Sequence, residues 1–268
     1  RDDWIPAPRF GVVQKDKVRG VDDFKANKAN SATRVTEKLR VTSTDDLVGV
    51  AKELDRRMPG VSLAAWVLDE TRAYRQVAVR PDQRHLAVVA LRDPNSNTVC
   101  FVVMIGHSFG QTAAVYNYCR RAAIIDDLLN CCMRVPGWHY YDDKFGITLS
   151  SLVDSTLATV KDLHSWLGVR FDNGKTVSGP AVTILGVAYD FLRGRVNLTE
   201  ERRTTLTEEI RKVLAEDTLS PGQAAKLKGK LGFVCCHFQG RYGRAHLRPL
   251  SDRQYRKVGG GSSVQGQS

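Results

Sequence analysis

Two adjacent carboxylates at a short turn constrain this chain more than any other feature. Tyr140–Tyr141–Asp142–Asp143 lies between short apolar runs, a pattern typical of a β-hairpin with both acids at its tip. A third acid, Asp69, ends the apolar run 63–68. Acids at strand ends can converge, and Mg²⁺ prefers such oxygen ligands. The alternative is that Asp142 and Asp143 are only turn formers, because aspartate favours loops.

Composition indicates a globular chain with a polyanionic partner. Of the 268 residues, 42% are apolar, which is enough to bury a core. Lys and Arg number 40 against 29 Asp and Glu, for a net charge of +11. Such an excess attracts nucleic acid, although a generic basic surface has the same composition.

Cysteine spacing and hydropathy indicate an intracellular, soluble protein with no membrane partner. The six cysteines include two vicinal pairs and no Cys-x-x-Cys, so we expect reduced thiols and no zinc site. No apolar run approaches the roughly 20 residues that span a bilayer, and no signal peptide is visible. The chain begins at Arg1 without an initiator Met, so we expect a fragment. Nucleus and cytoplasm are not distinguished, nor is the oligomeric state.

Hydrophobic periodicity predicts an alternation of strands and helices. Segments with helical spacing are expected over 44–58, 111–135, 151–167, 199–215 and from Ser220 onward. Strand-like segments are expected as a pair within 10–24 and at 63–69, 85–91, 98–105, 138–141, 144–149, 169–171 and 181–191. Thr44 is expected to cap its helix, and Asn173–Gly174 to form a tight hairpin turn. This order predicts an α+β fold with an antiparallel sheet packed on helices.

On this plan, six motifs in order resemble the fingers, palm and thumb of reverse transcriptases, most closely those of retrotransposons. The resemblance covers residues 9–256. The motifs are the fingers segment 17–24, the palm segments 69–83, 108–110 and 140–143, the primer-gripping hairpin at 185–187, and the thumb segment 226–232. The implied architecture is a right-hand palm at 61–195 with a partial fingers segment at 1–60. A helical thumb-like segment at 196–256 and a disordered tail at 257–268 complete it.

The resemblance implies roles for individual residues. Asp69, Asp142 and Asp143 would be catalytic and would bind two Mg²⁺ ions, or Mn²⁺ in their place. Residues expected to bind the deoxynucleoside triphosphate are Lys17, Arg19, Arg72, Ala73, Tyr74, Phe109 and Gly110. Residues expected to contact the template and primer duplex are Tyr141, Leu185, Gly186, Lys226, Lys230, Arg241 and Arg244. The ring of Tyr74 would exclude a 2′-hydroxyl, and Lys15 remains an alternative to Lys17.

The implied function is RNA-directed DNA synthesis by two-metal nucleotidyl transfer, as part of a mobile retroelement. One alternative is a degenerate copy that binds nucleic acid without catalysis. Another is an RNA-dependent RNA polymerase, which usually has Gly at the position of Tyr141 and no aromatic gate at Tyr74. Three residues depart from the family pattern, namely Arg72, Ser108 and Val115. Neither template preference, priming mode nor host follows from the sequence, and no ribonuclease H or integrase segment is recognised within it.

Overall fold

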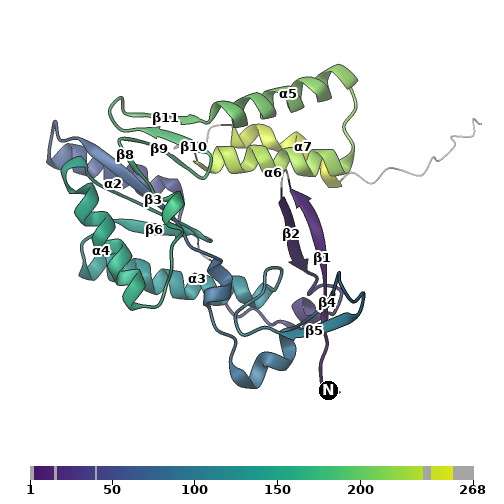
Figure 1. The fold of residues 1–268 in the computed structure, drawn as a ribbon. Helices are drawn as coiled ribbons and strands as arrows, with labels where there is room; N and C mark the ends of the chain where they lie inside the picture. Colours follow the sequence, from purple (N-terminus) through teal and green to yellow (C-terminus); the bar gives the residue numbers. More distant parts are fainter. Residues whose placement is uncertain (1–2, 15–16, 40, 238–242, 256–268) are drawn as a thin grey trace, which may run out of the picture. The chain divides into compact units, whose positions relative to one another are not determined.

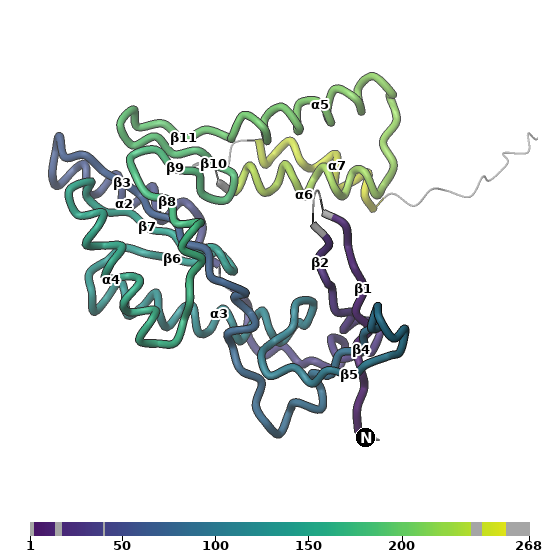
Figure 2. The backbone as a smooth tube through the Cα atoms, in the orientation of Figure 1, coloured from purple at the N-terminus to yellow at the C-terminus, as the bar shows by residue number. Residues whose placement is uncertain are grey.

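The computed structural model describes residues 3–14, 17–39, 41–237 and 243–255. The predicted tail at 257–268 and the predicted contact residue Arg241 lie outside these residues. The chain divides into two compact units, residues 1–42 with 50–182, and residues 43–49 with 183–268. Figures 1 and 2 follow the chain through both units. The boundaries expected between the fingers and palm segments at residue 60, and between the palm and thumb-like segments at residue 195, stay predictions.

The central sheet of the first unit carries the three acids. Its strand order is β6-β7-β3-β8, with every neighbouring pair antiparallel. The strands are β3 (Leu63–Asp69), β6 (Gly137–Tyr140), β7 (Asp143–Leu149) and β8 (Val177–Gly179). In the register of β3 with β7, Asp69 lies opposite Asp143. The predicted hairpin of β6 and β7 is confirmed, with Tyr140 opposite Asp143 across a two-residue turn.

Two helices provide the core on which this sheet packs. They are α3 (Thr112–Asp127), which continues into one π-helical turn at Leu128–Cys132, and α4 (Val153–Trp166). Their apolar stripes meet the buried side chains of β3 in one cluster, which comprises Trp66, Leu68, Ile125, Leu129, Val160, Leu163 and Val169. Close packing leaves no room for a side chain at residue 146, where an added Cβ atom would lie 2.2 Å from the Trp66 ring. The hairpin therefore lies directly on the core.

A second sheet of the first unit has the order β2-β1-β4-β5. Its strands are β1 (Ala7–Gln14), β2 (Lys17–Asp22), β4 (Val88–Arg92) and β5 (Val99–Val103), and β1 pairs with β4 in parallel. The strand expected at 85–91 is wrong in its first half, because residues Pro81–Leu86 form a 3-10 helix. A proline at the start of that segment suits a helical first turn and not a ladder position. Phe24 and the short helix α1 (Ala29–Ala32) complete this part of the core.

Helix α2 (Thr44–Arg57) was predicted with Thr44 as its cap. In the structure Thr44 is already helical, and the side chain of Ser43 accepts the hydrogen bond from the Asp45 amide at 3.2 Å. Asp45 and Asp46 occupy the first turn and Arg56 and Arg57 the last, which suits the helix dipole at both ends.

Besides the start of α2, the described residues of the second unit form a three-stranded sheet and three α-helices. The strands are β9 (Ala181–Ile184), β10 (Val187–Asp190) and β11 (Arg195–Leu198), in the order β11-β10-β9. The helices are α5 (Glu200–Glu216), α6 (Pro221–His237) and α7 (Arg248–Tyr255), of which α7 was not predicted. The capping box expected at Ser220 is confirmed, since Ser220 and Gln223 exchange hydrogen bonds of 2.8 and 3.2 Å.

Two sequence expectations near this unit are wrong. The single strand that the residue pattern predicted at 181–191 is two strands joined by a turn, as the resemblance to a hairpin at 185–187 implied, because Leu185 and Gly186 have positive φ angles of 53° and 73° and reverse the chain. Asn173–Gly174 is not a hairpin turn but part of a 3-10 turn, in which the Asp172 carboxylate accepts from the Gly174 amide at 3.1 Å. The α+β class itself is confirmed. Among the described residues, no helix is both long and apolar enough to cross a membrane.

Candidate active site

The three predicted acids lie at one edge of the central sheet. Asp69 is the last residue of β3, Asp143 is the first of β7, and the two are register partners. Directly opposed residues of an antiparallel pair place their Cβ atoms on the same face, roughly 4.5–5.5 Å apart. Asp142 precedes Asp143 in the turn of the hairpin. Segments more than seventy residues apart in sequence therefore supply neighbouring carboxylates.

The turn that carries Asp142 has a strained backbone. Tyr141 adopts a φ angle of +52°, a region that costs free energy for a bulky residue. Its ring packs at the edge of the Tyr140 ring, with centroids 5.1 Å apart, and against the apolar cluster of Ala73 and Tyr118. The surrounding aromatic packing thus holds the tyrosine in this conformation, and the turn projects the acid beside it.

The electrostatics of this edge favour a cation. Burial, followed by the charges of Asp142 and Asp69, raises the pKa of Asp143 to about 6, and the charge of Lys175 opposes this rise. Lys175 forms an ion pair with Asp69 and lies 3.7 Å from Asp172. Sequence reasoning missed Lys175, whose position after a turn-forming segment gives no signal of a partner one hundred residues away.

The donor set suits Mg²⁺, but it is not a closed cage. Within the described ranges, no three His, Cys, Asp or Glu side chains are gathered into a group that could hold a metal ion. Mg²⁺ usually keeps several waters and takes only one or two carboxylates together with substrate phosphates, so an open edge of hard oxygen ligands fits it. Asp69 and Asp142 or Asp143 would be those ligands.

Neutralising Asp143 should stabilise the metal-free protein in a pH-dependent manner. The folded pKa of about 6 lies above the ordinary 3.8, so stability falls as pH rises from about 4 to 6 and stays low above that. Asp143→Asn should therefore raise the free energy of unfolding by about 1 kcal/mol at pH 8, after discounting for exposure, and by nothing below about pH 4. Urea unfolding in chelator at several pH values measures this, with the exposed Asp154→Asn as control. An equal gain at pH 4 and pH 8 would contradict the electrostatic cause.

Tyr74 lies beside the acids in a cage of aromatic rings. It belongs to a 3-10 turn at Ala73–Gln76, and its ring centroid lies 5.1 Å from those of Phe109 and Tyr118. Burial, followed by the charge of Asp142, raises its pKa far above the ordinary value. Arg72 precedes this turn with a φ of +52°. The predicted nucleotide residues Ala73, Tyr74 and Phe109 are therefore brought together.

Gly110 occupies a position that only glycine fits. Its φ angle is +93°, and an added Cβ atom would lie 2.4 Å from the carbonyl oxygen of Asp22 at the end of β2. Asn30 also donates to the Gly110 carbonyl at 2.8 Å. The loop before α3 is thereby held against the end of the strand that carries Arg19. The Arg19 side chain is exposed, and Lys17 begins β2, although its side chain lies outside what the structure describes.

In the second unit, two predicted nucleic-acid contacts line one cavity. The cavity measures about 590 Å³ and is bordered by Gly186 at the β9–β10 turn and by Lys230 on α6. Arg202 of α5, which sequence reasoning missed, donates to the Leu185 carbonyl at 2.7 Å and stacks over Phe233 at 4.6 Å. The φ angle of +73° at residue 186 favours glycine, and an added Cβ atom would lie 2.5 Å from the Arg202 guanidinium, which would have to move.

Two further predicted contacts, Lys226 and Arg244, are exposed cations. Lys226 is one helical turn before Lys230 on α6, and Arg244 begins a short 3-10 turn before α7. Lys230 is partly neutralised by Glu209 of α5 at 2.6 Å. The roles of these residues stay predictions.

Comparisons with known proteins support the fold. No protein-family model and no curated protein matches the sequence. A foamy viral protease-reverse transcriptase in complex with double-stranded DNA is similar over 92% of this chain, with a TM-score of 0.64 and 16% identity. The foamy viral protease-reverse transcriptase in complex with an RNA/DNA hybrid is similar over 92%, with a TM-score of 0.60 and 14% identity. This chain spans 38% and 30% of those two proteins. The chain therefore has a reverse-transcriptase-like fold.

Proposed function

We propose that this chain is the polymerase part of a retrotransposon RNA-directed DNA polymerase. It would add deoxynucleotides to the 3′ end of a primer paired with an RNA or DNA template. The observation that carries this proposal is the register of β3 with β7, which sets Asp69 opposite Asp143 beside the Asp142 turn. The reverse-transcriptase-like fold supports it. Primer extension by the purified protein tests it, with deoxynucleotide incorporation expected on both templates.

At this edge of the sheet the acids would bind the metal ions, and the neighbouring backbone, cations and aromatic rings would position the nucleotide. When bound, two Mg²⁺ ions would activate the primer 3′ oxygen and stabilise the leaving phosphate. Asp69 and Asp142 would hold both ions, Asp143 would contribute to one of them, and Mn²⁺ would be an acceptable substitute. The backbone over 70–73 would receive the nucleotide phosphates, together with cationic charge from Arg19 and Lys17. The base and sugar would lie against Tyr74 and Phe109.

Tyr74 is expected to select the sugar. Because its ring is fixed between Phe109 and Tyr118, a ribose 2′-hydroxyl placed above it would enter occupied volume. Tyr74→Ala should therefore incorporate ribonucleotides that the parent protein rejects, by a change of roughly 10²-fold in discrimination, with a smaller loss for deoxynucleotides. Competition between the two nucleotides on one template measures the ratio. Tyr116→Ala in α3 is the matched control. Equal ribonucleotide use by parent and variant would favour the RNA polymerase alternative.

The basic excess is expected to appear as salt-dependent binding of the duplex. Affinity for a primer-template should fall log-linearly with salt, because each phosphate contact releases counterions. Lys226→Gln should reduce the slope by about 1, whereas Lys161→Gln on α4 should leave it unchanged. Fluorescence anisotropy at several salt concentrations measures both. A salt-independent affinity would show that the net charge of +11 is not a nucleic-acid footprint.

A second candidate is a degenerate copy that binds the duplex without extending it. It is favoured by the ion pair of Lys175 with Asp69 and by the departures at Arg72, Ser108 and Val115. Primer extension separates the two candidates, because duplex binding without incorporation in Mg²⁺ or Mn²⁺ would select the degenerate copy.

A further inference from the structure

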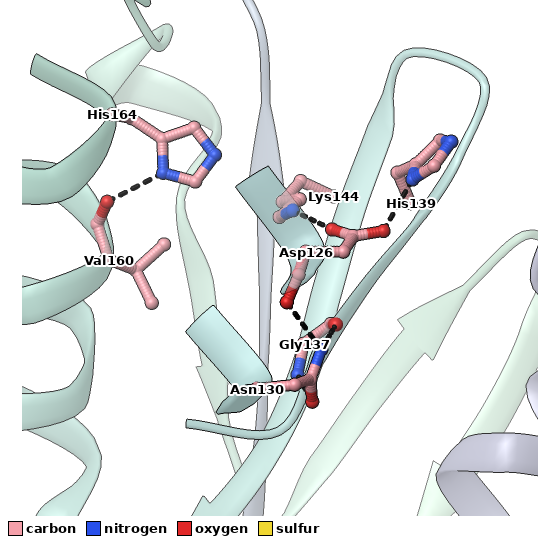
Figure 3. Close-up of polar contacts among 7 residues, drawn as sticks. All are labelled: Asp126, Asn130, Gly137, His139, Lys144, Val160 and His164. Carbon is pink, nitrogen blue, oxygen red and sulfur yellow. Dashed lines mark hydrogen bonds and ion pairs between the residues drawn. The ribbon is translucent and has the colours of Figure 1, made fainter. Parts of the chain in front are cut away.

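A buried ionic cluster lies beneath the hairpin that carries two of the acids. The carboxylate of Asp126, on α3, contacts both strands of that hairpin: the Lys144 ammonium of β7 and the His139 ring of β6, the latter at 2.5 Å. Figure 3 shows the Asp126 carboxylate between these two side chains. One side chain of one helix thus joins both strands.

A second contact from the same region holds the start of the hairpin. Asn130, four residues after Asp126 and within the π-helical turn, donates to the Gly137 carbonyl at 2.7 Å (Figure 3). It also donates to the Asp126 carbonyl at 2.7 Å, and it accepts from the Gly137 amide at 3.3 Å. π-Helical turns are often found at functional sites. Here the turn provides a bidentate contact to the first residue of β6.

Core packing alone does not account for a charge at this place. Lys144 is 1% exposed and directly follows Asp143, so strand alternation sends its side chain to the face opposite Asp143. His139 and Asp126 are also buried. A buried lysine is costly to desolvate, whereas an apolar residue would join the nearby cluster of Trp66 and Ile125 without that cost. The ion pair therefore serves something other than burial.

A second buried ion pair accompanies the first. Glu70, the residue after Asp69, is 4% exposed and accepts from Arg121 at 2.5 Å. Burial lowers the pKa of Lys144, and the charges of Asp126 and then Glu70 oppose that effect, whereas Arg121 adds to it. Asp69 and Asp143 are therefore each followed in sequence by one charged residue that is buried and paired with a residue of α3.

The contacts of Asp126 with Lys144 and His139 can fix the register of the hairpin strands, because ion pairs and hydrogen bonds are directional and apolar contacts are not. A one-residue slip of a strand moves all its side chains to the other face, and here it would separate Asp143 from Asp69. The same slip would pull Lys144 and His139 away from Asp126, leaving buried charges unpaired. Buried ionic groups are best attested in such a register role.

We propose that the Asp126–Lys144–His139 cluster is a positioning device that fixes the β6–β7 hairpin so that Asp142 and Asp143 stay beside Asp69. Its catalytic consequence rests on the proposed polymerase function. That the cluster fixes the position of the hairpin does not rest on the proposed function, because this part of the proposal concerns the fold of the first unit.

Removing both charges together tests position separately from stability. Lys144→Met/Asp126→Leu removes both charges of the buried lysine–aspartate pair together, so the protein is expected to fold, with the loss of the hydrogen bond to the His139 ring. Amide hydrogen exchange over Gly137–Leu149 should become about 10-fold faster than in the parent, while α4 is unchanged. Val169→Ala, in the same core cluster but outside α4, is the control for lost stability and should leave the hairpin's exchange relative to α4 unchanged.

Primer extension measures the consequence for chemistry. The double variant should lose kcat by roughly 10²-fold with little change in the KM for deoxynucleotide, since misplacement near reacting atoms is costly. Asp126→Asn keeps an acceptor oxygen for Lys144 and should give an intermediate rate, which supplies a second variant if the double variant does not fold.

The outcomes separate the two proposals. Parental exchange in the hairpin of the variants would overturn the positioning device, and so would faster exchange with parental kcat. If the parent protein itself extends no primer, the proposed function falls, and hydrogen exchange alone decides whether the cluster fixes the hairpin.

Discussion

Asp142→Asn is expected to reduce primer extension by roughly 10³-fold or more while leaving the protein folded. Asp142 stands in the turn next to Asp143, which faces Asp69 across the β3–β7 ladder, and the loss of one carboxylate would remove a ligand shared by both metal ions. Because neighbouring acids repel one another without metal, the variant should be at least as stable as the parent in chelator. Single-turnover extension and urea unfolding measure the two quantities.

A matched control distinguishes loss of this carboxylate from loss of any acid. Asp162→Asn makes the same chemical change on the exposed face of α4 and should extend primers at the parental rate. Asp69→Asn should behave as Asp142→Asn does. Extension near the parental rate by either variant would contradict the catalytic assignment and leave Asp142 as a turn former.

Lys144→Met is expected to lower the free energy of unfolding by roughly 3–5 kcal/mol. The substitution preserves the approximate length of the side chain, but it leaves the buried Asp126 carboxylate without its cation. In Lys144→Met/Asp126→Leu most of that loss should return, because two apolar side chains can replace a buried ion pair at little net cost. Urea unfolding monitored by circular dichroism measures both variants.

The same substitution at an exposed lysine supplies the control. Lys25→Met, on the surface of the first unit, should change stability by no more than about 0.5 kcal/mol. A small effect of Lys144→Met on the free energy of unfolding would indicate that the Lys144 side chain is already a neutral amine, or that it reaches water. A double variant less stable than the single one would contradict the view that Asp126 is destabilised by the loss of its partner.

The sequence by itself determined the elements whose signals are local. The apolar stripes predicted α3 and α4, the Ser220 capping box marked the start of α6, and the acids at residues 142 and 143 marked the hairpin tip. Helical spacing and capping act over a few residues, so they can be read without knowledge of the fold. The order of these elements also gave the α+β class.

Only the tertiary structure decided which distant residues meet. The run 181–191 looked like one strand because periodicity does not show where φ turns positive, and the turn at Leu185–Gly186 accepts a hydrogen bond from Arg202, which follows it on α5. The register that sets Asp69 opposite Asp143, the ion pair of Lys175 with Asp69, and the place of Lys144 beside Asp126 all join segments far apart in sequence. Such contacts depend on how two strands and a helix pack together, and no local pattern encodes that arrangement.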